Sequence, residues 1–236
     1  MSSLGNETFY QRYGKRIIDL CLSLVLLILF WWVLAIVAIL VRLKLGSPVL
    51  FKQPRPGKDE KIFNLYKFRT MTDECDENGN LLPDDERLTK FGKALRATSL
   101  DELPEVLNIV RGEMAIIGPR PQLVRDMVFM TPEQRKRHLV RPGLSGLAQV
   151  NGRNAIAWDD KLAYDLKYIE RITFAGDSAI FFNTITKAFV KQEGITEDGM
   201  ATAADYGDYL LAEGRVSREE YDGLQAQARQ LLETVR

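Results

Sequence analysis

A single apolar segment near the N-terminus constrains this chain more than any other feature. Residues 20–41 form a run of 22 residues in which Ser23 is the only polar one. At about 1.5 Å per residue, a helix of this length is about 33 Å long, which matches the hydrocarbon core of a bilayer. Secretory signal peptides have apolar cores of only about 7–15 residues, and a buried core helix is normally shorter or has a polar face. The segment therefore predicts a retained membrane element.

Basic residues lie on both sides of this segment. Arg12, Lys15 and Arg16 precede it, and residues 42–58 contain five more lysines and arginines. Because positive charge prefers the cytoplasmic side, two topologies stay open: a segment that enters and leaves by one face, and a true span whose C-terminal side is inside. A re-entrant helix needs a break with satisfied backbone groups, and residues 20–41 contain neither Pro nor Gly. In both topologies the remainder of the chain is expected in the cytoplasm.

Composition disfavours several kinds of site. Cys21 lies inside the apolar segment and Cys75 in an acidic stretch, so a disulfide is not expected, and no CxxC motif is present. With His138 as the one histidine, a His-based metal site or a Ser-His-Asp triad elsewhere is hard to build. The net charge is zero, but residues 191–236 contain ten acidic and five basic side chains, so the rest of the chain has a charge of +5. A basic body suits an anionic membrane and anionic substrates, although ordinary surface charge gives the same balance.

The sequence after the apolar segment predicts a small β-sheet among helices. Strands are expected at 49–53 and 62–68, a turn at 54–57, and loops at 73–85 and 141–146. Helices are expected at 88–96, 103–110, 158–169 and 179–190, with Thr131 and Pro132 opening another and Ser217 opening a C-terminal one. The fold class is therefore α+β and mostly helical, with a membrane-anchoring region (1–48), a compact soluble domain (49–200) and a C-terminal helical extension (201–236).

Apolar positions repeat along one face of the C-terminal helix. They are Tyr221, Leu224, Ala228, Leu231, Leu232 and Val235. Such a stripe needs a partner, which is either the body of the domain or a second subunit. A homodimer through this helix is one of these two hypotheses.

Two adjacent carboxylates, Asp101 and Glu102, are the first candidates for chemistry. Ser99 and Glu102 have the spacing of a helix capping box, so one interpretation of Glu102 is structural. The functional interpretation makes Asp101 a nucleophile or a metal ligand that Glu102 supports. Carboxylates form phosphoryl-enzyme intermediates, and Mg²⁺ prefers one or two carboxylates together with substrate phosphates. The pattern leaves both interpretations open.

Several cations lie near Pro, Gly or the ends of expected elements. They are Lys67, Arg69, Arg96, Arg111, Arg120, Arg141 and Arg153. Any one of them alone is explained as a solvated surface charge, but several together would clamp a diphosphate, since a guanidinium donates two hydrogen bonds to one phosphate. Gly118-Pro-Arg-Pro121 holds Arg120 in a rigid turn, and the glycines between Arg141 and Arg153 suggest a binding loop. No Walker A or GxGxxG spacing is present, which disfavours an ATP or dinucleotide site.

The order of these motifs resembles a known family, the small monotopic phosphoglycosyl transferases or bacterial sugar transferases. The similarity extends from about residue 13 to residue 199. Its motifs are Arg16-Ile-Ile-Asp19, Gly46-Ser47, Gln53-x-Arg-Pro-Gly57, Tyr66-Lys-Phe-Arg-Thr-Met71, Ser99-Leu-Asp-Glu-Leu103, Gly118-Pro-Arg-Pro121, Arg141-Pro-Gly143 and Gly146-x-Ala-Gln-Val-Asn-Gly-Arg153. Motifs of this length and number make a chance match implausible.

The resemblance implies a reaction and a set of site residues. Such an enzyme transfers a sugar-1-phosphate from a UDP-sugar to polyprenyl phosphate and releases UMP, with an N-acetylated amino-sugar as the expected sugar. Asp101 is then the nucleophile that forms a covalent phospho-sugar intermediate, assisted by Glu102, and Mg²⁺ is expected at this pair with Asp101 as its ligand. The positions that match substrate-binding residues are Lys67, Arg96, Arg120, Arg153 and Asp165.

The resemblance also implies a location. It is the bacterial inner membrane, with a re-entrant helix in the lipid and the catalytic domain on the cytoplasmic face, so membrane lipid is a partner and nucleic acid is not. The family's helix usually breaks at a Ser-Pro pair, whereas Trp31 and Trp32 occupy the aligned position here. Two alternatives stay open: a membrane-anchored scaffold that needs no Asp-Glu pair, and a hydrolase that acts on a polyprenyl diphosphate with water as the acceptor.

Overall fold

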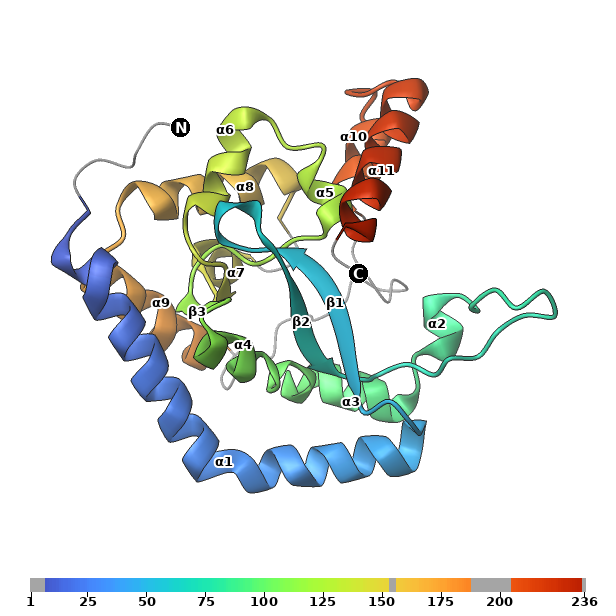
Figure 1. The fold of residues 1–236 in the computed structure, drawn as a ribbon, viewed down its shortest axis with the longest axis horizontal. Helices are drawn as coiled ribbons and strands as arrows, with labels where there is room; N and C mark the ends of the chain where they lie inside the picture. Colours follow the sequence, from blue (N-terminus) through green and yellow to red (C-terminus); the bar gives the residue numbers. More distant parts are fainter. Residues whose placement is uncertain (1–6, 153–155, 188–204, 235–236) are drawn as a thin grey trace.

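Helices make up most of the chain, and two small sheets lie among them (Figure 1). The computed structural model describes residues 7–152, 156–187 and 205–234. The α-helices are α1 (Lys15–Leu45), α2 (Asp84–Arg87), α3 (Lys90–Ala97), α4 (Glu105–Arg111), α5 (Val124–Met127), α6 (Pro132–Arg135), α7 (Leu147–Asn151), α8 (Trp158–Glu170), α9 (Phe174–Thr186), α10 (Tyr206–Ala212) and α11 (Arg218–Glu233). The strands are β1 (Leu50–Pro56), β2 (Ile62–Phe68), β3 (Ala115–Ile117) and β4 (Gly143–Ser145), and the short π- or 3₁₀-helical turns are η1 (Tyr10–Gly14), η2 (Lys58–Glu60), η3 (Leu100–Glu102) and η4 (Lys136–Leu139). The predicted α+β, mostly helical class is confirmed, although the sheet is split into two pairs of strands.

The apolar segment lies within one long helix, α1, which is bent near its middle (Figure 1). Its length and hydropathy are sufficient to cross a membrane. Many of its large apolar side chains are exposed, among them Ile28 at 72% and Trp31 at 64%. A contiguous apolar surface of this kind is unfavourable in water and marks a contact with lipid or protein. The helix therefore indicates that the protein associates with a membrane.

Both halves of α1 contact the same folded body. In the first half, Arg16 donates to two backbone carbonyls at the end of α4, at 2.6 and 3.0 Å. Asp19 accepts the backbone N–H of the middle residue of β3 at 3.0 Å. In the second half, Val37 and Val41 are buried against side chains of β2 and α3. One domain thus holds both ends of the apolar segment.

A side-chain hydrogen bond lies near the middle of α1. The indole N–H of Trp32 donates to the carbonyl of Leu29 at 2.9 Å. Sharp bends in helices occur at Pro, at Gly, or where a side chain inserts into the backbone hydrogen-bond ladder. Since residues 20–41 contain neither Pro nor Gly, neither of these residues causes the bend.

The first sheet is a hairpin that extends further than predicted. β1 pairs antiparallel with β2, from Leu50 opposite Phe68 to Pro56 opposite Ile62. The second predicted strand is confirmed, but the turn expected from Pro54 onward is wrong because the first strand continues through Pro56. A sheet of two strands leaves each strand one free edge, where a proline without an N–H group is tolerated. The chain reverses instead at η2.

The second sheet depends on close contact between glycines. β3 and β4 pair in parallel, so the loop predicted at 141–146 is wrong in part. A Cβ at Gly143 would lie 2.1 Å from the nitrogen of Gly118, and a Cβ at Gly146 would lie 2.1 Å from the Gly118 oxygen. Only glycine fits these positions. The contacts fix the backbone from which the turn toward Arg120 begins.

The remaining predicted helices are present with shifted ends. α8 matches its prediction, and Thr131 caps α6 as predicted, with a proline at the first position. α3 begins slightly later than expected, after a cap by Thr89. α9 begins earlier, at Phe174, and residues 188–190 of its predicted range lie outside the described residues.

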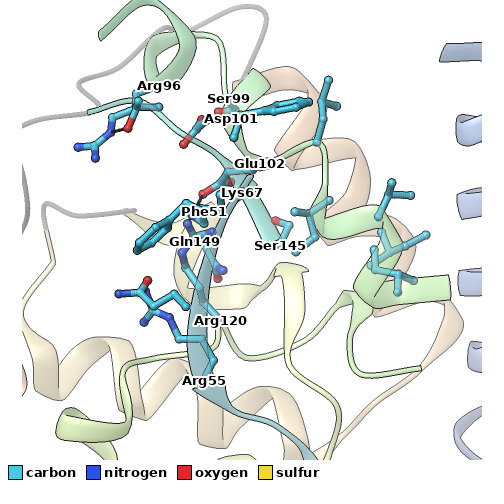
Figure 2. A pocket seen from close by; sticks show the side chains of 18 of the residues that line it. Phe51, Arg55, Lys67, Arg96, Ser99, Asp101, Glu102, Arg120, Ser145 and Gln149 are labelled. Atoms are coloured by element: carbon cyan, nitrogen blue, oxygen red, sulfur yellow. Dashed lines mark hydrogen bonds and ion pairs between the residues drawn. The ribbon is translucent and has the colours of Figure 1, made fainter. Parts of the chain in front are cut away.

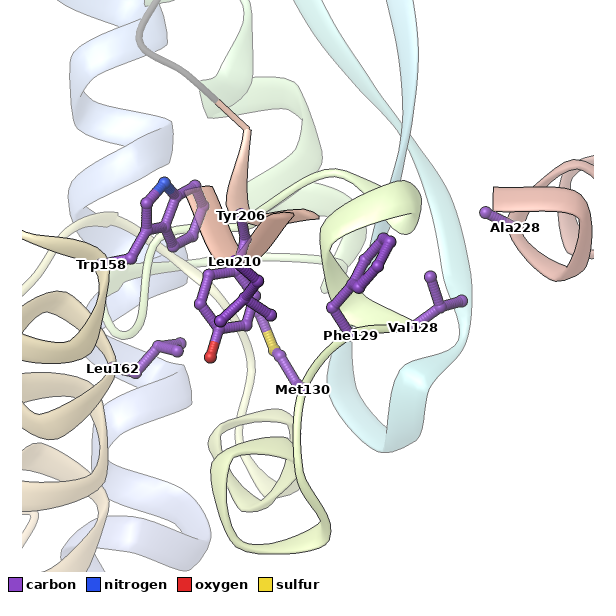
Figure 3. Close-up of a cluster of buried hydrophobic side chains, with 8 residues drawn as sticks. All are labelled: Val128, Phe129, Met130, Trp158, Leu162, Tyr206, Leu210 and Ala228. Atoms are coloured by element: carbon purple, nitrogen blue, oxygen red, sulfur yellow. The ribbon is translucent and has the colours of Figure 1, made fainter. Parts of the chain in front are cut away.

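The C-terminal helices pack on the body of the domain. Their buried cluster consists of Val128, Phe129, Met130, Trp158, Leu162, Tyr206, Leu210 and Ala228 (Figure 3). Tyr221, Leu224 and Leu231 of the predicted apolar stripe pack against this cluster. Val235 lies outside the described residues. The body of the domain therefore covers most of the stripe, and the homodimer stays a prediction.

Candidate active site

The segment that contains the two adjacent carboxylates has an irregular backbone. Ser99 is in the left-handed region, with φ at 54°, and its side chain caps no helix. The helix behind it, α4, begins only after Pro104. The capping box predicted from Ser99 and Glu102 is therefore wrong. Glu102 lies in η3 instead, and its carboxylate bonds to two cations rather than to a helix N-terminus.

Glu102 is the centre of a compact ion cluster (Figure 2). Its Oε1 accepts hydrogen bonds from Lys67 Nζ at 2.8 Å and from Arg120 Nη2. The Lys67 ammonium also lies 3.4 Å from Oε1 of Glu105 on α4. Lys67 belongs to β2 and Arg120 to the loop after β3. Three segments that are distant in the sequence therefore meet at one carboxylate.

The charges in this cluster change one another's acidity. Burial raises the pKa of Glu102, but the charges of Arg120 and Lys67 outweigh it and hold the pKa well below its ordinary value. The Glu102 carboxylate in turn raises the pKa of Arg120, against the opposing effect of burial. Burial and the neighbouring Glu102 charge raise the pKa of Glu105 to about 7. Glu102 is therefore permanently ionised near neutral pH, whereas Glu105 is poised to gain or lose a proton.

Asp101 lies beside this cluster without joining it. Its side chain is 8% exposed and lines a cavity, and among the described residues it has no hydrogen bond or ion pair. Burial, followed by the charge of Glu102, raises the pKa of Asp101, while nearby cations oppose the rise. A carboxylate that is more basic than usual and has no other partner is available as a nucleophile or a ligand.

Further cations line the same cavity. Arg96 donates from Nε to the hydroxyl of Thr70 at 3.1 Å, and Arg69 forms an ion pair with Asp73 at 3.0 Å. Arg55 also reaches the cavity, although the sequence did not predict it as a site residue. Burial, followed by the charge of Arg120, lowers the pKa of Arg55 to about 10.

Other predicted cations lie elsewhere. Arg111 bonds to the hydroxyl of Tyr66, and Arg141 donates to the carbonyl of Gly112 at 2.8 Å. Neither is part of the cavity wall. Arg153 lies outside the described residues. Of the predicted phosphate clamp, the structure brings together Lys67 on β2, Arg69 directly after it, Arg96 on α3 and Arg120 in the loop after β3.

The cavity has a volume of 1390 Å³ and two kinds of wall. One is the charged cluster around Asp101 and Glu102. The other is apolar and comes from one face of α1, with Leu22, Val25, Leu26, Phe30 and Leu34. A ligand with an anionic head and a hydrocarbon chain would find both surfaces in one space.

Asp165 takes part in a buried chain of contacts behind Arg120. Its Oδ2 accepts from Nε and Nη2 of Arg137 at 2.9 and 2.7 Å, and both side chains are almost fully buried. The same Nη2 of Arg137 donates to the backbone carbonyl of Arg120 at 2.5 Å. Asp165 also lines the cavity, and its Oδ1 has no partner among the described residues. Asp165 therefore positions Arg120 through Arg137.

Comparison with known proteins identifies the family. The family model described as bacterial sugar transferase matches residues 10–191. The chain belongs to the bacterial sugar transferase family. As a sugar transferase it is an enzyme, which removes the scaffold alternative.

Relatives of this sugar transferase differ in length. The sugar transferase EpsL of Bacillus subtilis (strain 168) is 47% identical over 189 residues, which cover 80% of this chain and 93% of EpsL. The UDP-glucose:undecaprenyl-phosphate glucose-1-phosphate transferase of Klebsiella pneumoniae is 37% identical over 188 residues, which are 75% of this chain but 40% of that protein. The UDP-N-acetylgalactosamine-undecaprenyl-phosphate N-acetylgalactosaminephosphotransferase of Aeromonas hydrophila is 36% identical over 179 residues, 72% of this chain and 42% of that protein.

Three charged residues of the sugar transferase site were not predicted from the sequence. Glu105 has the position of an ordinary first-turn acid, and Arg137 lies in a basic run typical of a solvated surface. Both are in fact only 2% exposed. Arg55 lies where a turn was predicted. A search for charges inside the motifs that carry the family resemblance would have found Arg55 but neither of the other two.

Glu105 makes the stability of the sugar transferase depend on pH. Its pKa rises from 4.5 to about 7 on folding, so the folded protein holds a proton that the unfolded chain releases. Stability should therefore fall as the pH rises through this interval, and Glu105→Gln should remove that part of the fall. Relative to wild type, the variant should gain about 2–3 kcal/mol in the free energy of unfolding between about pH 5 and about pH 8, measured by urea unfolding in detergent.

Glu86→Gln is the matched control, because Glu86 is exposed on α2. Burial also raises the pKa of Asp126 to about 6, but this group titrates in both proteins and cancels in the comparison. A difference between Glu105→Gln and wild type that does not change with pH would contradict the prediction.

Asp165→Ala should reduce stability as well as activity. The substitution leaves the Arg137 guanidinium buried without its charged partner, which costs about 3–5 kcal/mol. Asp160→Ala, at an exposed position of the same helix, should change the free energy of unfolding by less than about 0.5 kcal/mol. Unfolding curves and initial rates are measured on both. If Asp165→Ala were inactive but as stable as wild type, Asp165 would contact substrate without positioning Arg120.

Proposed function

We propose that this enzyme transfers a sugar-1-phosphate from a UDP-sugar to a polyprenyl phosphate and releases UMP. The observation that supports this most directly is the cavity, whose wall combines the charged cluster with the apolar face of α1. Converging cations suit a diphosphate, and an apolar wall on a membrane helix suits a polyprenyl chain. The relatives from K. pneumoniae and A. hydrophila are named for UDP-sugars and undecaprenyl phosphate.

The donor sugar differs among the relatives. We favour an N-acetylated amino-sugar, which agrees with the name of the A. hydrophila relative. The names of the relatives from K. pneumoniae and Escherichia coli (strain K12) specify glucose instead. A panel of donors that contains both kinds of sugar therefore identifies the sugar that this enzyme transfers.

The reaction proceeds in two displacements at one phosphorus atom. An oxygen of Asp101 attacks the phosphorus next to the sugar, and the bond from this phosphorus to the bridging oxygen breaks. UMP leaves with the electron pair of that bond, and the phospho-sugar stays on Asp101. An oxygen of the polyprenyl phosphate then attacks the same phosphorus, and the Asp101 carboxylate leaves. The product is a polyprenyl-diphospho-sugar, and a carboxylate nucleophile divides one difficult displacement into two.

The cations around Asp101 offset the charge of the phosphates. Lys67, Arg96 and Arg120 stabilise the negative oxygens as charge develops on the leaving UMP. Glu102 holds Lys67 and Arg120 in place, which is its supporting role. We assign Arg153 and Asp165 to substrate binding on the family pattern, in addition to the contact between Asp165 and Arg137.

Mg²⁺ is the cofactor that we propose, with Asp101 as its protein ligand. Among the described residues, no group of three or more His, Cys, Asp or Glu side chains could hold a metal ion without substrate. Asp101 nevertheless fits a site made of one carboxylate and several phosphate oxygens, because its carboxylate lies in the cavity and has no other partner in the described part of the chain. When bound, Mg²⁺ neutralises part of the diphosphate charge.

We also propose that α1 is re-entrant and that the catalytic domain lies on the cytoplasmic face of the bacterial inner membrane. A spanning helix would place Arg16 and Asp19 across the bilayer from α4 and β3, which they contact. The basic residues at both ends of the apolar segment favour the same side. The bend in α1 also supports this topology (Figure 1).

The reaction is tested by incubating the purified enzyme with a panel of UDP-sugars, polyprenyl phosphate and Mg²⁺. UMP should appear with one sugar, and Asp101→Asn should reduce its rate by at least about 1000-fold, as expected for the loss of a nucleophile. Asp160→Asn is the matched control. With donor alone, mass spectrometry should detect a phospho-sugar on Asp101. Free phospho-sugar in place of the lipid-linked product would favour the hydrolase, and wild-type activity in Asp101→Asn would exclude the covalent mechanism.

The topology is tested by cysteine labelling in intact bacteria. In a Cys21→Ala background, Cys75 reports the catalytic domain and Glu7→Cys reports the segment before α1. Neither position should react with a membrane-impermeant maleimide until the cells are permeabilised, after which both should react. Labelling through Glu7→Cys alone in intact cells would show that α1 spans the membrane.

A further inference from the structure

Gln149 has a side-chain carboxamide that takes no part in the ion cluster around Glu102. The residue belongs to α7 and lines the cavity. Its Nε2 and Oε1 are both shielded from solvent, and among the described residues neither has a hydrogen-bond partner. Leaving a buried donor and a buried acceptor unpaired is unfavourable, and such groups are rare in folded proteins. A carboxamide of this kind in a cavity wall indicates a ligand that pairs with both atoms.

The surrounding backbone leaves room for this carboxamide. A Cβ at position 146 would lie 2.9 Å from Gln149 Oε1, so the glycine there keeps the space open. α7 follows directly on β4, and the hydroxyl of Ser145 at the end of this strand lies 2.6 Å from the hydroxyl of Thr184 on α9. The carboxamide is therefore presented by packed elements rather than by a free loop.

The neighbours of Gln149 define what it can bind. Figure 2 shows Gln149 on the part of the cavity wall that Arg120, Arg55 and Phe51 also line. The two arginines only donate hydrogen bonds and suit phosphate oxygens, which only accept. A carboxamide has one accepting and one donating atom, so a phosphate would leave half of it unpaired. The matching ligand group is neutral and offers a donor beside an acceptor.

We propose that Gln149 is a specificity-determining residue that binds a neutral edge of the donor substrate, with Nε2 donating to that edge and Oε1 accepting from it. This inference rests on the proposed function, in which the donor is a UDP-sugar. Two parts of a UDP-sugar have such an edge. The uracil ring has an imide N–H beside a carbonyl, and the sugar has hydroxyl or acetamido groups. The diphosphate and a polyprenyl chain have none.

The test measures ligand binding rather than turnover. Isothermal titration calorimetry of the full-length protein in detergent, in an Asp101→Asn background, gives dissociation constants for UMP and for each UDP-sugar. Gln149→Met keeps the length of the side chain and removes both polar atoms, and Gln149→Glu keeps an acceptor but loses the donor. Gln227→Ala is the control, because Gln227 is exposed on α11. We expect Gln149→Met to weaken UDP-sugar binding by about 10-fold, Gln149→Glu by more, and the control not at all.

The response of UMP identifies the edge. Equal weakening of UMP and UDP-sugar binding assigns Gln149 to the uracil, and weakening of UDP-sugar binding alone assigns it to the sugar. Unchanged binding of both ligands, in a variant that melts at the wild-type temperature, overturns the proposal. If Gln149→Met does not fold, Gln149→Asn withdraws the amide by one methylene and is used in the same comparison. A protein that binds neither UMP nor any UDP-sugar before Gln149 is changed would overturn the proposed function itself.

Discussion

The carboxylate of Glu102 is the interaction on which the rest of the site depends. Lys67 lies on β2 and Arg120 in the loop after β3, and without a counter-charge the two cations would repel each other. Glu102 accepts a hydrogen bond from both, and partial burial strengthens these charge interactions relative to those on the surface. Because Glu102 is held in this way, the member of the pair without a side-chain partner among the described residues is Asp101. Two adjacent carboxylates thus have different environments and can take different roles.

A second set of contacts holds Arg120 beside Glu102. The guanidinium of Arg137 bonds to the Arg120 carbonyl, and Asp165 balances the charge of Arg137 in the interior. Gly118 also contacts Gly143, the first residue of β4, and Gly146, directly after this strand, and these contacts fix the same turn from the other side. Groups fixed before substrate arrives need no reorganisation when charge develops, which is the general condition for electrostatic catalysis. The glycines of the predicted binding loop therefore act through packing.

Local patterns predicted those parts of the fold that depend on local physics. β2, α8 and the Thr131 cap follow from alternation, periodicity and capping chemistry, and the structure has them. The capping box at Ser99 failed because two cations from elsewhere in the chain take the Glu102 carboxylate. The adjacent carboxylates Asp101 and Glu102 stood out in the sequence itself, and the resemblance implied their roles, but spacing along the chain contains no information on burial. The sequence analysis therefore missed Glu105. This acid lies in a first helical turn, as many surface acids do, and only the three-dimensional packing shows that it is buried.

The geometry also bears on the order of events in the proposed reaction. The proposed donor contains two phosphates and the proposed acceptor one, whereas the cluster centred on Glu102 has two cations among the described residues, Lys67 and Arg120. Holding all three phosphates there at once would leave several negative charges without partners, which is costly in a partly buried site. An intermediate on Asp101 avoids this, because UMP can leave before the second anion binds. The apolar face of α1 lines the same cavity. In the proposed reaction, a lipid phosphate can therefore enter from the membrane and attack the phosphorus that is bound to Asp101. In the proposed reaction, Lys67 and Arg120 then serve both displacements in turn.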